Sequence, residues 1–278
     1  MELIERYIES HYYRYEHINK YSPKKLNKYI QKTQDKFVAE SREWTIKKNS
    51  IWLLRLYASI KMMLSSTVLY SHYEFSENKQ LYLSMPYYEY YGLLNCCRAL
   101  TLSRPEKDEF ETVFKAPHST IINLTVETLK SIDNNLANEF EKHINLLKDR
   151  REMFSYNFPT KKIEEEMTTF YDTLEYSKLI CEIAQLNSLI LEESKKNNSD
   201  SFVLDSQYIK EDVQKYFDSL EDFNRLRYIA RKMYMPHNLF VMCTEGLVED
   251  FLGNFMDEYT EENNLGCLHN LQLIFPFP

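Results

Sequence analysis

The chain has 278 residues, a formal net charge of −8 and only four glycines, where average usage of roughly 7% predicts about 19. Because these glycines are scattered, the sequence contains no G-x-G-x-x-G turn, no Walker-type phosphate loop and no G-x-S-x-G nucleophile elbow. Sheet folds also need frequent residues with positive φ at their tight turns. The composition therefore excludes glycine-built nucleotide sites and predicts an all-α protein.

Charge is distributed unevenly along the chain. Residues 1–65 carry 13 Lys/Arg against 7 Asp/Glu, a balance of +6, which leaves −14 for the remaining residues. The last 41 residues contain seven acidic side chains and no Lys or Arg. This polarity suits docking on a protein partner, on a second copy or on nucleic acid through the N-terminal region, and a solvated basic helix without a ligand is the alternative.

The sequence predicts a cytoplasmic protein without membrane contact. Its first residues are acidic where a signal peptide needs a basic patch, and no apolar run reaches the roughly 18 residues of a membrane span. Five cysteines without C-x-x-C spacing indicate reduced core thiols rather than disulfides or metal ligands. Cys267 and His269 form the only Cys/His pair at short spacing, so we expect no metal site and no cofactor.

The first third of the chain contains two helical stretches, broken at Tyr21-Ser-Pro23, where Ser22 is expected to cap the second helix. Residues 24–48 are basic and sparsely apolar, with aromatic residues between the lysines. A phosphate backbone or an acidic partner would fit such a surface. The candidate binding residues are Lys24, Lys25, Lys28, Lys32, Lys36, Lys47 and Lys48.

Three core helices are predicted next. The segment Ile51–Tyr70 is too continuously apolar for a one-faced surface helix and is expected to be buried. A polar loop at 76–80 precedes a helix from Tyr87 to about Leu102, which Arg104-Pro105 ends. Helical spacing of apolar residues returns in a third core helix that begins at or near His118.

A turn is expected at the Asn/Asp-rich residues 133–138, followed by a helix with an arginine on its apolar face. At 100° per residue, Arg151 falls within the stripe formed by Phe140, Ile144, Leu147 and Phe154. A guanidinium there is costly unless it is paired or lies in a solvated cleft. Arg151 is therefore either an ion-paired or snorkelling residue or an active or recognition arginine.

The longest periodic segment runs from Lys162 to about Glu193 and is expected to be surrounded by other helices in its second half. The polar run at 194–201 is the strongest linker signal. We therefore divide the chain into a basic N-terminal helical region (1–84), a central helical bundle (85–196) and an acidic C-terminal helical region (197–278). The uncharged tail at 271–278 needs a groove, either its own or a partner's.

Three segments resemble, in order, the HEPN superfamily (higher eukaryotes and prokaryotes nucleotide-binding). They are the aromatic-rich helix YYEYYGLLNCCRAL at 87–100, the His-containing helix entry KAPHSTII at 115–122, and REMFSYN at 151–157, which resembles the family's R-x-x-x-D-Y helix end. The resemblance covers about residues 85–192 and implies a HEPN-like up-down helical bundle with additional N- and C-terminal helices. It also implies a role in microbial toxin–antitoxin or antiviral systems.

Catalytic members of that family are metal-independent ribonucleases whose motif places a His about four to six residues after an Arg. Here Arg151 matches the Arg, but Ser155-Tyr156 stands where the His would fall. Our first hypothesis is therefore a non-catalytic accessory or antitoxin-like subunit that binds a partner protein, a second copy or nucleic acid. The alternative is a ribonuclease that uses Arg151 with His118 or Tyr156, in which Arg stabilises the cleaved phosphate and the second group handles the proton.

Overall fold

The computed structural model describes residues 3–9, 13–105, 114–156, 170–196, 224 and 238–243. Every element in this part of the chain is helical and none is a strand, so the predicted all-α class is confirmed for these residues. The long helices are α1 (Pro23–Ser41), α2 (Ile46–Asn78), α3 (Met85–Ser103), α5 (His118–Ile132), α6 (Asn134–Tyr156) and α7 (Phe170–Lys196). The short ones are η1 (Glu5–Glu9), η2 (Ile18–Lys20) and α10 (Leu239–Cys243).

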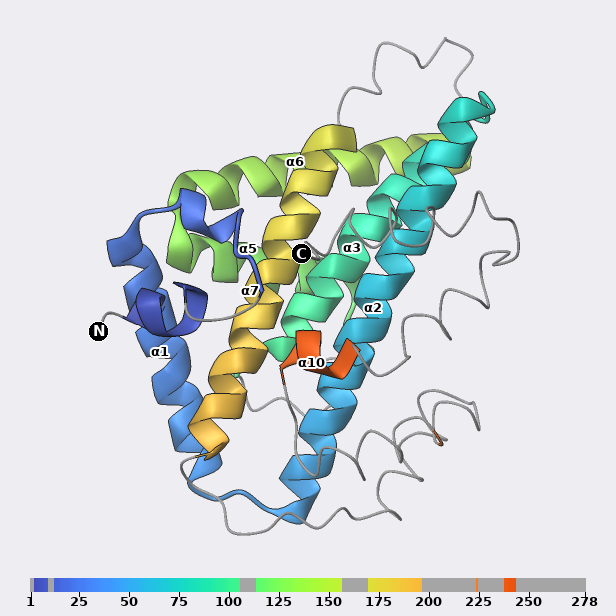
Figure 1. The fold of residues 1–278 in the computed structure, drawn as a ribbon. Coiled ribbons are helices and arrows are strands. Elements are labelled where there is room, and N and C mark those ends of the chain that lie inside the picture. Colours follow the sequence, from blue (N-terminus) through green and yellow to red (C-terminus); the bar gives the residue numbers. More distant parts are fainter. Residues whose placement is uncertain are drawn as a thin grey trace, which may run out of the picture.

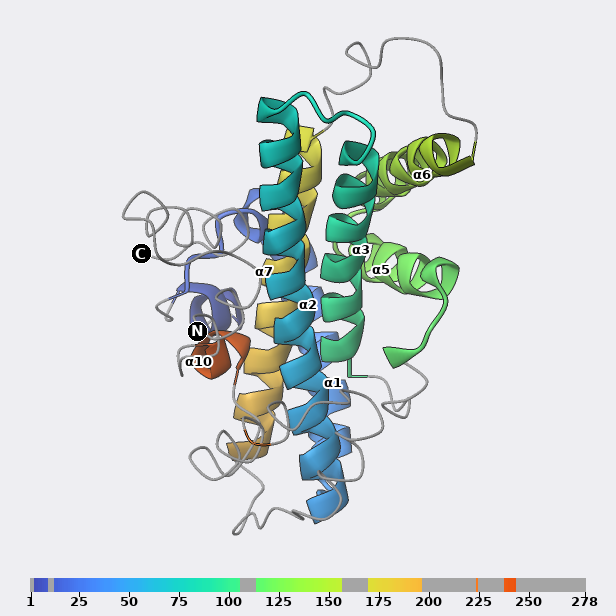
Figure 2. The same cartoon turned by 90° about the vertical axis from the view of Figure 1, so that its right-hand side faces the viewer.

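Helices α2, α3 and α7 lie side by side at the centre of the fold (Figure 1), and α3 contacts both of the others. Helix α1 packs against α7. Helices α5 and α6 contact each other and cover the side of α3 that faces away from α2 (Figure 2). Helix α6 runs across the direction of α3 and α7. The finer expectation, a HEPN-like up-down bundle, remains a proposal.

The predicted core helices are present, with small shifts at their ends. The segment 51–70 lies within α2, which begins after Thr45, because the Thr45 hydroxyl accepts a hydrogen bond from the Lys48 amide at 3.2 Å. Helix α2 also continues to Asn78 and so includes the first three residues of the predicted loop. Helix α5 begins at His118, as predicted, directly after Pro117. The Ser22 side chain makes no capping hydrogen bond, although α1 starts at Pro23.

The turn predicted at 133–138 is wrong beyond its first residue, because α6 already begins at Asn134. Asp133 Oδ1 accepts hydrogen bonds from the amides of Asn135 and Leu136, at 2.8 and 3.2 Å. One aspartate therefore caps a helix whose first residues are asparagines, and the low helix propensity of asparagine does not delay the start.

The linker predicted at 194–201 is wrong for its first residues, because α7 continues through Lys196. Ser194 and Lys195 are buried, with 3% and 1% exposed surface. Lys195 Nζ donates a hydrogen bond to Asn49 Oδ1 at 3.0 Å and lies 4.0 Å from the centre of the Trp44 ring. Asn49 on α2 and Trp44 just before it thus supply the contacts that allow Lys195 to be buried.

One hydrophobic core joins the two regions on either side of residue 84, where the N-terminal region was expected to end. Helix α2 packs along α3 closely enough that a Cβ at Gly92 would collide with the Tyr70 ring, so only glycine fits at that position. Of the predicted C-terminal region, the structure describes Asn224 and residues 238–243. Among the described helices, none is both long and apolar enough to cross a membrane.

Candidate functional site

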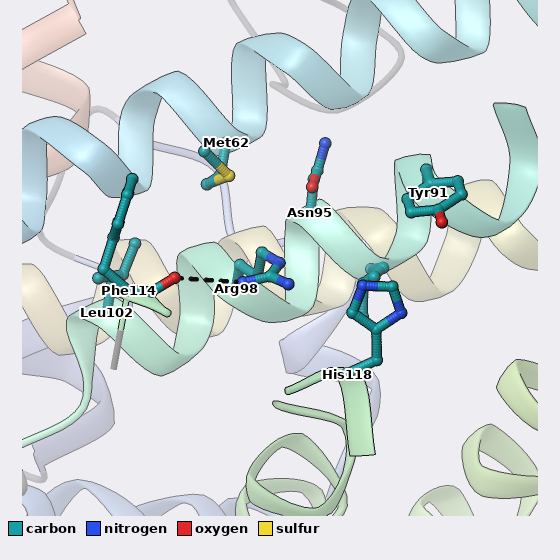
Figure 3. A pocket seen from close by; sticks show the side chains of 8 residues that line it. Met62, Tyr91, Asn95, Arg98, Leu102, Phe114 and His118 are labelled. Carbon is teal, nitrogen blue, oxygen red and sulfur yellow. Dashed lines mark hydrogen bonds between the residues drawn. The ribbon is translucent and has the colours of Figure 1, made fainter. Parts of the chain in front are cut away.

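A cavity of about 330 Å³ lies beside α3, between α2 and the start of α5 (Figure 3). Met62, Leu94, Leu102 and Phe114 form its apolar lining. Its remaining lining residues carry polar groups, namely Tyr91, Asn95, Arg98 and His118. The cavity is therefore apolar over part of its wall and able to hydrogen-bond over the rest, as small-ligand sites usually are.

His118 enters this cavity because it is the first residue of α5, where the chain turns into the helix after Pro117. Its Nδ1 atom lies 3.1 Å from the hydroxyl oxygen of Tyr90. Its ring also packs edge-on against Tyr91, with ring centres 5.8 Å apart. Two neighbouring tyrosines of α3 thus orient the imidazole.

The surroundings of His118 favour a neutral imidazole. Burial lowers its pKa below the usual value of 6.5, and the positive charges of Arg98, Arg151 and Lys148 lower the pKa further. Every charged group of the described chain that shifts this pKa is a cation. At pH 7 the ring is therefore uncharged and surrounded by positive charge, a setting that attracts an anion.

Arg98 comes from α3, one turn before the end of that helix, and points into the same cavity (Figure 3). One of its N–H groups donates to the Phe114 carbonyl oxygen at 3.3 Å. Half-burial lowers its pKa, but a guanidinium remains charged at any physiological pH. The other donors of Arg98 make no hydrogen bond to the described residues and are available to a ligand.

Arg151 lies on the buried face of α6, as its angle on the helical wheel predicted, and its side chain is 15% exposed. The guanidinium lies 5.2 Å from the centre of the Tyr90 ring and 5.9 Å from that of Tyr91. It also contacts Glu152 Oε1 at 3.4 Å, a long and partly exposed ion pair. Its Nε–H is buried and has no hydrogen-bond partner in the described residues. Aromatic faces, rather than a buried carboxylate, accommodate this cation.

Tyr90, which is not among the site residues predicted from the sequence, contacts both His118 and Arg151. It is fully buried and lies in the second turn of α3. Burial raises its pKa, and the nearby Arg151 charge opposes that rise. Its position in a run of four tyrosines at 87, 88, 90 and 91 marked an aromatic helix, but nothing in the run distinguishes Tyr90 from the other three.

Tyr156, the other candidate proton-transfer group, lies apart from this cluster. It is the last residue of α6 and is 76% exposed. No contact joins it to His118 or Arg151 within the described chain. The structure thus brings together the pair Arg151 and His118, through Tyr90 and Tyr91, and leaves Tyr156 on the surface.

The N-terminal lysines divide into paired and unpaired residues. Lys25 forms an ion pair with Asp133 at 2.6 Å, and Lys48 lies 3.6 Å from a Glu40 carboxylate oxygen. Lys24, Lys28 and Lys32 are exposed at four-residue spacing along α1 and make no ion pair with the described residues; we call them the α1 lysine row. A shallow hollow of about 560 Å³ over this helix is lined by Lys28, Gln31, Lys32, Asp35, Lys36 and Ala39. The last candidate, Lys47, is exposed.

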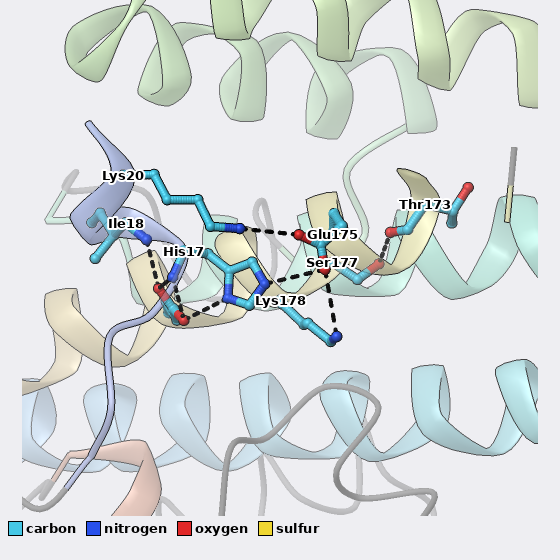
Figure 4. A network of polar contacts seen from close by, with 8 residues as sticks. His17, Ile18, Lys20, Thr173, Glu175, Ser177 and Lys178 are labelled. Atoms are coloured by element: carbon cyan, nitrogen blue, oxygen red, sulfur yellow. Dashed lines mark hydrogen bonds and ion pairs between the residues drawn. The ribbon is translucent and has the colours of Figure 1, made fainter. Parts of the chain in front are cut away.

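A second polar cluster ties the N-terminal segment to α7 (Figure 4). The buried Glu182 carboxylate accepts backbone N–H groups of His17 and Ile18 at 2.8–3.0 Å and contacts His17 Nδ1 at 2.9 Å. Burial alone would lower the His17 pKa, but hydrogen bonding and charge from Glu182 and Glu175 raise it. Because backbone amides use much of the acceptor capacity of Glu182, we interpret this cluster as structural.

Metal ligands are not grouped in the part of the chain that the structure describes, where no three His, Cys, Asp or Glu residues lie close enough to hold an ion. Cys96, Cys97 and Cys181 are buried free thiols, which confirms the prediction for these three cysteines. Cys267 and His269 lie outside the described residues.

No protein-family model matches the chain, and neither the curated proteins nor the solved structures include a significant match to it.

Proposed function

We propose that the cavity lined by His118 and Arg98, with Arg151 on the adjacent Tyr90 and Tyr91 rings, binds a phosphate group of a nucleic acid and does not cleave it. The observation that carries this proposal is the convergence of cations: both arginines and Lys148 act on one neutral histidine, and no carboxylate lines the cavity. A phosphate offers several acceptor oxygens and negative charge, which match guanidinium donors. The first hypothesis, a HEPN-like accessory or antitoxin-like subunit of a toxin or defence system, fits such binding.

Two features favour binding over catalysis. Tyr156, one of the two proton-transfer candidates, lies on the surface at the end of α6. His118, the other, already uses Nδ1 in a contact with Tyr90. The metal-independent ribonuclease remains the alternative, because Arg151 and His118 do lie against the same two tyrosine rings.

Binding and cleavage of labelled tRNA in EDTA test the proposal. We expect the wild type to bind and to leave the RNA intact. Removal of one charge-assisted hydrogen bond costs about 2 kcal/mol, so Arg98→Gln and Arg151→Gln should each weaken binding roughly tenfold or more. Arg14→Gln is the matched control, because Arg14 is exposed and does not line the cavity.

Two results would contradict this function. Equal RNA affinity for the wild type and both arginine variants would exclude the cavity as the phosphate site. Cleavage that persists in EDTA and disappears in Arg151→Ala would establish the ribonuclease instead.

The α1 lysine row supports a second candidate function, docking on an acidic partner protein. Its three ammonium groups are exposed and make no ion pair with the described residues, whereas Lys25 and Lys48 are paired. A partner that neutralises this row would associate faster and with strong salt dependence. A protein partner or a homodimer thus remains a proposal that is independent of the cavity.

A further inference from the structure

Tyr90 contacts both candidate phosphate ligands, Arg151 through its ring and His118 through its hydroxyl group. The residue is fully buried, and its hydroxyl oxygen lies 3.1 Å from His118 Nδ1. Arg151 packs on its ring, with the guanidinium 5.2 Å from the ring centre. The direction of the hydrogen bond between the Tyr90 hydroxyl and Nδ1 therefore decides where His118 carries its proton.

Hydrogen-bond accounting selects one arrangement. The Tyr90 hydroxyl group is buried and therefore cannot rely on solvent as a hydrogen-bond acceptor. The Tyr90 O–H hydrogen then needs an acceptor, and within the described residues only His118 Nδ1 is in reach. In the opposite arrangement, with a proton on Nδ1, the buried O–H would have no acceptor among the described residues, which is unfavourable.

We propose that Tyr90 is a positioning residue that holds neutral His118 in the tautomer with its proton on Nε2, so that the site presents only hydrogen-bond donors. A base needs a lone pair where the proton is to be accepted, and in this tautomer Nε2 has none. The Nε2–H group instead donates to a phosphate oxygen beside Arg98 and Arg151. This inference rests on the proposed phosphate site and explains why that site binds without abstracting a proton.

The tautomer can be measured directly in the full-length protein. Two-bond ¹H–¹⁵N correlations of ¹⁵N-histidine-labelled protein at pH 8 distinguish a proton on Nδ1 from a proton on Nε2. Loss of one signal set in His118→Gln assigns His118 among the seven histidines. We expect the Nε2–H pattern, and an Nδ1–H pattern in the wild type would overturn the inference.

Tyr90→Phe removes only the hydroxyl group and should release the tautomer. We expect Nδ1–H and Nε2–H forms to become populated together, and affinity for tRNA to fall about fivefold, the equivalent of one neutral hydrogen bond of about 1 kcal/mol. Tyr91→Phe is the matched control for the tautomer measurement, because Tyr91 touches the same imidazole but makes no hydrogen bond to it in the described structure. An unchanged tautomer in Tyr90→Phe, or an equal change in Tyr91→Phe, would overturn the assignment to Tyr90.

The inference and the proposed function fail in different measurements. If Arg98→Gln and Arg151→Gln weaken RNA binding but His118 shows Nδ1–H, the phosphate site stands and the Tyr90 inference is wrong. If His118 shows Nε2–H but neither arginine variant affects binding, the tautomer is correct and the cavity is not the phosphate site.

Discussion

Several largely buried cations of the described chain lie against aromatic rings, among them Arg151 and Lys195. Arg151 packs on Tyr90 and Tyr91, and Lys195 lies 4.0 Å from the centre of the Trp44 ring. An aromatic face compensates part of the cost of removing a cation from water, by up to about 2 kcal/mol when the pair is desolvated. The two residues differ in their response to pH, because arginine keeps its charge and a buried lysine can lose it.

The burial of Lys195 predicts how the free energy of unfolding depends on pH. Burial lowers its pKa from 10.5 to about 7, so between these pH values the unfolded chain binds more protons than the folded one. Stability therefore rises with pH across this window, by about 2 kcal/mol between pH 7 and pH 9. We expect Lys195→Met to lack this rise. Urea unfolding of the wild type and of Lys195→Met at pH 7 and pH 9 measures this difference in stability.

Groups common to both chains, including the buried tyrosines, cancel when the two pH dependences are subtracted. The same rise in stability for Lys195→Met and for the wild type would show that Lys195 is not the group responsible. A larger rise in stability for Lys195→Met than for the wild type would contradict the expected sign.

At the scale of single helices, side chains outside a helix decide where it begins and ends. The Asp133 carboxylate starts α6 at Asn134, and Asn49 and Trp44 accommodate Lys195 near the end of α7. Both helices therefore extend into segments whose composition is typical of turns or linkers. By contrast, the lysine row on α1 needs no contact from outside the helix, because a four-residue spacing in the sequence places residues on one face of a helix.

Charge reversal on α1 tests the second candidate function. We expect Lys24→Glu/Lys28→Glu/Lys32→Glu to lose a co-purifying acidic partner, because the row then repels it. Co-purification followed by light scattering measures the loss. Lys130→Glu/Lys142→Glu is the control, because these exposed lysines lie on α5 and α6 outside the row. A partner retained equally by both variants would contradict docking on α1.

At the scale of the whole molecule, one core joins helices that the sequence suggested dividing. Leu53, Leu56 and Ile60 of α2 belong to the same buried cluster as Leu93, Leu100 and Ile183 of α3 and α7. The Glu182 carboxylate adds a polar tie between α7 and the N-terminal segment. The basic N-terminal region is thus part of the packing that holds the candidate site in place.

A fragment of residues 85–196 tests this shared core. Without α2, the apolar face that α3 buries against it becomes exposed, and exposed core surface leaves helices without fixed packing. We expect the fragment to keep a helical far-UV circular dichroism spectrum and to lose most of its near-UV signal, with the full chain as the control. Well-dispersed amide resonances and a cooperative unfolding transition in the fragment would show an independent domain.

The sequence by itself determined the helical class, the buried character of α2, the start of α5 at His118 and the inward face of Arg151. These properties follow from composition and from the 3.6-residue period, which act within one segment. Only the tertiary structure decided that His118 and Arg151 meet at Tyr90, that Tyr156 stays outside, and that Lys195 is buried. Each of these depends on contacts between helices distant in the sequence, about which the periodicity of a single helix carries no information.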